Sequence, residues 1–254
     1  MSPVFDAYAA YYDLLYRDKD YAGEATFVCD LLHQYGITSG SLLELGCGTG
    51  KHAEYLARLG YGIHGVDMST AMIESARSRI PIELKEQLSF EVGDVRSVRV
   101  DCKFDAVISL FHVASYQTGN RDISAMFATA AEHLNPGGLF IFDFWYGPAV
   151  LTDRPAVRVK RMASDLFDVL RVAEPIMQPN NNIVEVNYIV LVFNHSDQRV
   201  KRINETHRMR YFFSPELRFL LEHTGFNVCA EVEWMTGMTM GFDTWSGVIV
   251  VIKQ

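Results

Sequence analysis

The fold of this chain is decided by residues 43–50, whose sequence is Leu43-Glu44-Leu45-Gly46-Cys47-Gly48-Thr49-Gly50. A short apolar strand runs into a turn of the form Gly-x-Gly-x-Gly, and a segment with helical periodicity follows at 51–59. Glycines let the backbone turn sharply and let a ligand approach main-chain atoms closely. The pattern therefore predicts a strand, a ligand-binding turn and a helix.

Strand and helix patterns alternate on both sides of this turn. Strand-length apolar runs lie at 62–66, 88–92, 104–110 and 138–144, and helical patterns lie at 22–35, 69–79 and 123–133. Such alternation with short turns predicts an α/β, Rossmann-like parallel sheet with helices on both faces. Ligands of these folds bind at the carboxyl ends of the strands, which is where the glycine turn lies.

The helical rhythm disappears between residues 157 and 213. Three long strands separated by turn signals are expected there, at 164–174, 183–193 and 198–212. We interpret 151–213 as an inserted antiparallel β-sheet that covers the site. A helical cap and the Rossmann-like core then occupy 1–150, and the last helix and two strands of the core occupy 214–254.

Composition narrows the class of protein. The chain has 254 residues, of which 49% are hydrophobic and 21% charged, so a folded globular protein is expected. Its net charge of −8 argues against a nucleic-acid binder, which needs a basic surface. Four cysteines without a CxxC pair indicate no zinc site and a reduced, cytoplasmic protein. No apolar run approaches the roughly 20 residues of a membrane helix, and no signal peptide is evident.

Two acids follow the glycine turn at informative distances. Asp67 ends the next predicted strand about 20 residues after Gly46, where a carboxylate accepts ribose hydroxyls in dinucleotide sites. Asp94 ends the third strand, where it can accept from an adenine amino group. Each acid alone is compatible with an ordinary turn or cap, but the two in this order favour a nucleoside-binding site.

At these residues the chain resembles the class I S-adenosylmethionine-dependent methyltransferases, over roughly 40–145. A nicotinamide dehydrogenase would carry Gly-x-Gly-x-x-Gly instead, whereas this turn has Gly-x-Gly-x-Gly with Glu44 two residues ahead. The resemblance implies a seven-stranded sheet with an antiparallel last strand, supplied by residues near 245–252. It also implies S-adenosyl-L-methionine as the cofactor, and no metal.

A narrower resemblance extends over most of the chain. Residues 12–16 and 19–25, and later Glu205-Thr206-His207-Arg208, are similar to segments of the sugar N,N-dimethyltransferases, which act on nucleotide-linked amino sugars. Those enzymes place a histidine near the amine at the position of Tyr116, whereas this chain has His112 four residues earlier. The departure leaves open whether the acceptor is an amino sugar.

The resemblance implies a set of cofactor contacts. It places Tyr12, Tyr21 and Leu110 near the methionine moiety. The backbone of the glycine turn would line the cofactor through Gly46, Cys47, Gly48 and Gly50, with Glu44 just before them. Asp67 and Met68 would lie at the ribose and adenine, and Asp94 and Val95 at the adenine.

Candidate catalytic residues lie just past the fourth strand. His112 can act as a general base, because its unperturbed pKa is near 6.5, and Tyr116 can orient the nucleophile. The alternative for His112 is a structural role in capping its loop. The expected substrate contacts are Tyr8, Trp145, Tyr146, His207 and Arg208, with Trp145 equally explained as core.

The insertion carries its own charge pattern. Residues 154–210 hold ten Lys and Arg against six Asp and Glu, which makes this segment +4 in an acidic chain. Most of these side chains suit a solvated sheet face, but Arg208 is the first candidate for a phosphate contact.

The sequence therefore predicts methyl transfer to a small molecule, a sugar or nucleotide-linked sugar, on nitrogen or oxygen. The alternatives are another small metabolite as acceptor, or a non-catalytic cofactor-binding scaffold. The insertion also offers a surface for a homodimer.

Overall fold

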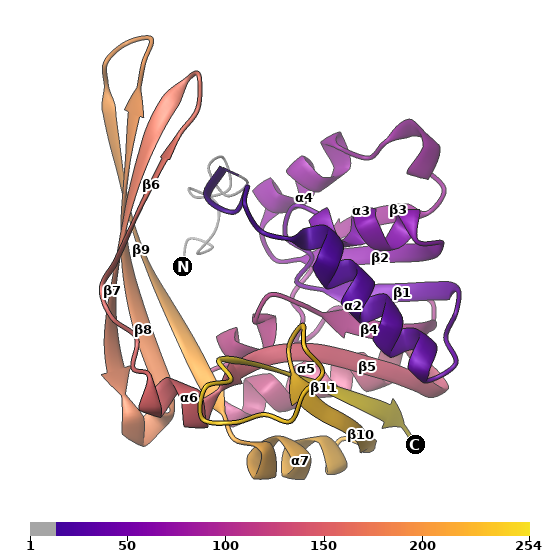
Figure 1. Cartoon of the computed structure of the whole chain (residues 1–254). Helices are drawn as coiled ribbons and strands as arrows, with labels where there is room; N and C mark the ends of the chain where they lie inside the picture. The colour runs from indigo at the N-terminus through magenta and orange to yellow at the C-terminus, as the bar shows by residue number, and fades with distance from the viewer. Residues whose placement is uncertain (1–13) are drawn as a thin grey trace.

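The computed structural model of the chain describes residues 14–254. Tyr8 and Tyr12 lie outside the described residues, so their expected roles stay predictions. Figure 1 shows a sheet covered by helices and, beside it, a tall set of long strands that rises away from the core.

The core sheet has the order that the strand and helix alternation predicts. Its strands are β1 (Gly40–Leu45), β2 (Tyr61–Asp67), β3 (Leu88–Val92), β4 (Phe104–Ser109), β5 (Leu134–Tyr146), β10 (Phe226–Glu233) and β11 (Ser246–Lys253). The first five are parallel in the order β3-β2-β1-β4-β5, β11 pairs antiparallel with β5, and β10 pairs antiparallel with β11. This arrangement confirms the Rossmann-like sheet and its antiparallel last strand.

Helices cover both faces of the core sheet. Successive residues of a strand point to opposite faces, so each face of the sheet packs against its own helices. The helices are α2 (Tyr21–Gln34), α3 (Lys51–Arg58), α4 (Thr70–Ser78), α5 (Asn120–His133), α6 (Gly147–Thr152) and α7 (Ser214–Glu222), with 3-10 turns η1 (Ile82–Leu84), η2 (Val113–Tyr116) and η3 (Pro179–Asn181). Leu42 packs in the core cluster that α2, α3 and α4 share, whereas Leu43 packs in the cluster of α5 and α7.

The insertion contains four strands, so the expectation of three was wrong. They are β6 (Arg158–Ala163), β7 (Phe167–Gln178), β8 (Ile183–Asn194) and β9 (Val200–Phe212), each antiparallel to the next. The missed strand β6 is a short edge strand with three basic residues among its six, so it lacks the apolar alternation of a core strand. The end of β9 continues the core sheet, because Trp145 and Tyr146 of β5 pair in parallel with Tyr211 and Phe212.

The segment before α2 links the insertion to the core. Leu15 is fully buried against Met162, Val169 and Val190 on one face of the insertion. Residues 16–19 therefore lie between that sheet and α2, above the carboxyl ends of the core strands (Figure 1). Within the described part of the chain, no helix has the length and apolar character needed to cross a bilayer.

Candidate active site

The glycine turn has the backbone conformation that its sequence requires. Gly46, Gly48 and Gly50 have φ of 81°, 53° and 73°, in the left-handed region that disfavours other residues. A Cβ atom on Gly46 would lie 2.5 Å from Val113, and one on Gly50 would lie 2.7 Å from Phe90. A Cβ atom on Gly48 would meet nothing within 4 Å, so this glycine faces open space beside the turn.

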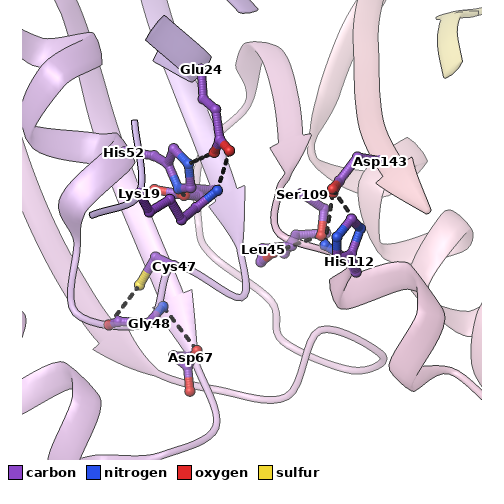
Figure 2. A network of polar contacts seen from close by, with 11 residues as sticks. Lys19, Glu24, Leu45, Cys47, Gly48, His52, Asp67, Ser109, His112 and Asp143 are labelled. Carbon is purple, nitrogen blue, oxygen red and sulfur yellow. Dashed lines mark hydrogen bonds and ion pairs between the residues drawn. The ribbon is translucent and has the colours of Figure 1, made fainter. Parts of the chain in front are cut away.

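Asp67 joins the glycine turn to the next loop. One carboxylate oxygen accepts from the Gly48 amide at 3.0 Å (Figure 2). The other accepts from the Ser69 amide at 2.9 Å. Asp67 therefore lies at the glycine turn. The adjacent Met68 is 53% exposed, which leaves its side chain available to a ligand.

The remaining predicted cofactor contacts, at the adenine and at the methionine moiety, lie at the ends of β3 and β4. Asp94 forms an ion pair with Arg96, with Nη2 2.6 Å from Oδ2, and this hydrogen-bonded pairing holds the pKa of Asp94 below its usual range. Nothing in the sequence pattern points to Arg96 as its partner. Val95 and Leu110 are both buried in the core clusters.

Glu44 is a buried carboxyl group directly behind the glycine turn. Its side chain is 1% exposed, and burial, reinforced by the charge of Asp67, raises the pKa of Glu44 to about 8. Its Oε2 atom has no hydrogen-bond partner among the described residues. An unpaired buried oxygen is costly, so this oxygen is available to a donor on a ligand. Cys47, next to the turn, is buried too, and burial raises the pKa of its thiol.

A chain of ionisable side chains runs from Glu44 toward the N-terminal segment. His52 Nδ1 lies 3.8 Å from Glu44 Oε1, and His52 Nε2 donates to Glu24 Oε2 at 2.6 Å. Lys19 donates to the other oxygen of Glu24 (Figure 2). Burial alone would raise the pKa of Glu24, but His52 and Lys19 outweigh it and hold the pKa below its usual range. Tyr21, a predicted cofactor contact, packs edge-on against His52 with ring centroids 4.9 Å apart.

A cavity of about 370 Å³ opens between this chain of ionisable side chains and the insertion. Its walls come from the N-terminal segment, α2, the loop after β4, the end of β5, β6 and the β10–β11 region, and they are formed by Tyr16, Asp18, Lys19, Glu24, Phe111, His112, Asp143, Lys160, Trp234 and Ser246. Among the described residues that were predicted as catalytic, His112 lines this cavity.

His112 and Asp143 form a pair at the floor of this cavity. His112 Nδ1 lies 2.8 Å from Asp143 Oδ2, and the His112 amide donates to Asp143 Oδ1 at 2.9 Å (Figure 2). The Nδ1 contact has the distance of an ion pair without the direction of an ordinary hydrogen bond. The Asp143 side chain is 2% exposed and that of His112 is 23% exposed, so the carboxylate supports a ring that reaches the cavity.

Tyr116 and His207, which were predicted separately, are hydrogen-bonded to each other. The Tyr116 hydroxyl lies 2.7 Å from His207 Nδ1, and His207 Nε2 lies 3.0 Å from Glu205 Oε2. Nothing in the sequence pattern points to a role for Glu205 at the site. These three residues join η2 in the core to β9 in the insertion.

The remaining substrate candidates that the structure describes are not among the residues that form the cavity walls. Trp145 packs edge-on against Trp245 at 5.7 Å between centroids, which is the core alternative, although its ring is also 6.2 Å from that of His112. Tyr146 packs against Phe144.

Arg208 is exposed, and strand alternation puts it on the face of β9 opposite to His207. The structure therefore does not bring these two residues into one pocket, and the insertion's contribution to the cavity is Lys160.

The described residues contain no cluster of three His, Cys, Asp or Glu side chains that could hold a metal ion. They provide a glycine turn with an open face at Gly48 and the Asp67 carboxylate beside it. They also provide the unpaired buried oxygen of Glu44 and a cavity with the His112–Asp143 pair. This arrangement suits a nucleoside cofactor with a cationic end, placed beside a small polar acceptor.

Comparison with known proteins agrees with this geometry. A model of the methyltransferase domain matches residues 42–138. The chain is 30% identical over 243 residues to the dTDP-3-amino-3,4,6-trideoxy-alpha-D-glucopyranose N,N-dimethyltransferase of Streptomyces venezuelae, covering 95% of this chain and 97% of that protein.

Two solved structures extend the likeness to the whole fold. DesVI of Streptomyces venezuelae matches with a TM-score of 0.79 at 28% identity, covering 97% of this chain and 98% of that one. CalS10, an amino pentose methyltransferase from Micromonospora echinaspora solved with S-adenosylmethionine bound, matches with a TM-score of 0.75 at 25% identity, covering 100% and 99%. This chain belongs to the class I S-adenosylmethionine-dependent methyltransferases, in the family that includes the dTDP-amino sugar N,N-dimethyltransferases.

Proposed function

We propose that this enzyme methylates the amino group of a nucleotide-linked amino sugar. The observation that carries the proposal is the His112–Asp143 pair in a cavity that also receives Lys160 from the insertion. The histidine can take up a proton from the acceptor, and the lysine suits a phosphate-bearing handle on it. The relatives that match almost the full chain are named as amino sugar N,N-dimethyltransferases, which favours nitrogen over oxygen.

The residues around the glycine turn fit S-adenosylmethionine. Glu44 offers its unpaired buried oxygen to the cationic end, Asp67 offers carboxylate oxygens to the ribose, and Gly48 leaves room for close approach. When bound, the cofactor supplies a methyl group on a sulfonium, so the protein has mainly to align the acceptor and exclude water.

His112 and Asp143 then serve the acceptor. A neutral amine that received the methyl group would become a methylammonium ion while the sulfonium would become a neutral thioether, and we assign the proton that this ion loses to the free ring nitrogen of His112. Asp143 fixes the ring through Nδ1 and fixes the backbone through the His112 amide, so the proton acceptor keeps one orientation. The positive charge that forms on the imidazole is balanced by the Asp143 carboxylate.

The phosphates of the nucleotide are placed at the inner face of β6 and β7. Lys160 and Arg171 are cross-strand partners on this face. Lys160 donates to the carbonyl of Leu15, and Arg171 donates to the hydroxyl of Tyr16 at 3.2 Å. The two cations thus lie where the N-terminal segment meets the insertion, next to the cavity. Arg208 stays a secondary candidate, because it lies on a different face.

The outer face of the insertion supports a homodimer. It carries the half-buried or exposed apolar side chains Val159, Leu170, Val172, Ile189 and Leu191. Arg161 and Arg202 lie at the two sides of the row that holds Leu170 and Leu191, and Glu185 pairs with Arg208 toward the other end of the patch. A two-fold axis would set this patch against the same patch of a second copy. Sedimentation should show a dimer that Leu191→Asp converts to a monomer, and a wild-type monomer would refute the interface.

The cytoplasm is the compartment that we propose. Four cysteines, Cys29, Cys47, Cys102 and Cys229, are free thiols, which suits a reducing environment.

A paired acceptor assay tests the function. The purified protein is given S-adenosylmethionine with a dTDP-linked 3-amino sugar or with the matching 3-hydroxy sugar, and release of S-adenosylhomocysteine is followed. We expect release with the amino sugar alone. Release with the hydroxy sugar alone would assign oxygen methylation, and binding of the cofactor without release from either acceptor would favour a scaffold.

A further inference from the structure

The backbone at the floor of the cavity is strained. Phe111 and His112 both have φ of 64°, a left-handed conformation that is unfavourable for residues with a Cβ atom. Two such residues in succession persist only where the surrounding structure holds them. Because His112 lines the cavity, whatever holds this turn also sets the position of its imidazole.

One set of bonds holds the turn from the side of β5. The His112 amide donates to Asp143 at 2.9 Å, and the Ser115 hydroxyl accepts from the Trp145 amide at 3.0 Å. Both partners belong to β5, in the core. These bonds fix the start and the middle of the turn formed by His112 and η2.

A second set of bonds holds the end of η2 from the insertion. Tyr116, its last residue, is bonded to His207 at 2.7 Å, and His207 is bonded to Glu205 at 3.0 Å. The side chains of His207 and Glu205 are only 6% and 8% exposed. A carboxylate can only accept from Nε2, so Nε2 carries the hydrogen and Nδ1 accepts from the tyrosine hydroxyl. The bond directions along the chain are therefore set by Glu205.

We propose that Glu205 and His207 are positioning residues for methyl transfer, which act through Tyr116 on the strained turn that carries His112. The insertion then has two tasks at the same site. It lines the cavity through Lys160. Through the hydrogen-bonded Tyr116–His207–Glu205 chain it also fixes His112, the residue that we propose takes the proton of the acceptor. This inference rests on the proposed function only in giving His112 a role toward the acceptor.

Hydrogen exchange tests the structural half without any acceptor. Tyr116→Phe removes one hydroxyl, and Glu205→Gln keeps the volume while replacing the carboxylate. Thr206→Val is the matched control, because Thr206 lies between the two positioning residues and bonds Asn187 at 2.7 Å on the opposite face. Amides of residues 112–117 should exchange about tenfold faster in the first two variants, the effect of one lost hydrogen bond, and at the wild-type rate in the control. Unchanged exchange in Tyr116→Phe would overturn the proposal.

Kinetics with the amino sugar test the catalytic half. Tyr116→Phe and Glu205→Gln should lower kcat about tenfold and leave the KM for S-adenosylmethionine unchanged, as expected for a loss of alignment. In a His112→Ala background, Tyr116→Phe should have no further effect on kcat, because the two act through one group. An equal loss in both backgrounds would overturn the proposal. If the sugar is never methylated, the proposed function fails and the exchange result alone decides this inference.

Discussion

Asp143 holds His112 by two atoms, with one carboxylate oxygen 2.8 Å from the ring Nδ1 and the other accepting from the backbone amide at 2.9 Å. A single buried carboxylate thus fixes both the ring and the strained backbone of its partner. The arrangement leaves the second ring nitrogen for the acceptor, and it explains why a histidine on a loop can keep a defined position.

The variant Asp143→Asn should separate these two tasks. The asparagine side chain keeps a carbonyl oxygen for the His112 amide but loses the charge that balances a protonated ring. We expect kcat for an amino sugar to fall by less than about 10²-fold, since an amine can lose its proton in solution, and to recover as pH rises. A loss that is independent of pH would show that the charge of Asp143 is not used.

The acceptor atom determines how much His112 matters. His112→Ala should lower kcat by about 10²–10⁴-fold for a hydroxyl acceptor and much less for an amine. Single-turnover rates with the amino sugar and the hydroxy sugar measure the difference. Equal losses on both would mean that His112 acts on something other than the acceptor's proton.

Asp67→Ala should weaken S-adenosylmethionine binding by about 1.5–3 kcal/mol, the usual range for hydrogen bonds to a charged acceptor. Calorimetry measures the change. Asp105→Ala is the control, because its carboxylate also accepts from a backbone amide, that of Ser41 at 2.8 Å, but near the opposite end of β1. If Asp67→Ala and Asp105→Ala have the same dissociation constant for S-adenosylmethionine, Asp67 is not a cofactor ligand.

Glu44 should make stability depend on pH. Its pKa rises from the ordinary 4.5 to about 8 on folding, so the folded state favours the protonated form. The stability that this protonated group contributes is fully present below the ordinary pKa and is lost as pH rises through about 8. Glu44→Gln removes this ionisation. Without cofactor, its free energy of unfolding relative to wild type should therefore rise by about 1.4 kcal/mol for each pH unit between the two pKa values.

Urea unfolding of both proteins across that window measures the Glu44 effect. A difference in unfolding free energy between Glu44→Gln and wild type that does not change with pH would contradict the buried, neutral carboxyl group. Added S-adenosylmethionine should shrink the pH dependence, because its cationic end favours the ionised form.

Lys160→Ala should raise the KM for the nucleotide-linked acceptor about tenfold, the usual effect of losing one charge-assisted hydrogen bond, and leave the KM for S-adenosylmethionine unchanged. Arg161→Ala is the matched control, because Arg161 is the next residue of β6 and is exposed on the opposite face. Similar KM values for the two variants would remove the phosphate site from the inner face.

The elements on the proposed cofactor side of the site could be predicted from the sequence, because they are local. The glycine turn, the acid after β2 and the alternation of strands and helices are all set by short stretches whose spacing a parallel sheet fixes. Arg96 was missed although it lies two residues from Asp94, since nothing in the pattern distinguishes it from a surface arginine.

The acceptor side was harder because its groups come from distant segments. Glu205 and Tyr116 meet only through the packing of the insertion on the core, and no local pattern reports that contact. One error was avoidable: strand alternation already places His207 and Arg208 on opposite faces, so both could not face one pocket. The basic edge strand β6 was missed because strand periodicity was sought in apolar residues.

Mass spectrometry of the acceptor tests the central claim most directly. After incubation with S-adenosylmethionine and dTDP-3-amino-3,4,6-trideoxy-alpha-D-glucopyranose, the substrate named for the 30% identical relative, the products are fragmented to locate the added methyl groups. We predict one and then two methyl groups on the sugar nitrogen, with slower formation by His112→Ala. Methyl groups on a sugar oxygen, or an unmodified amine in the presence of an enzyme that binds both ligands, would contradict the account.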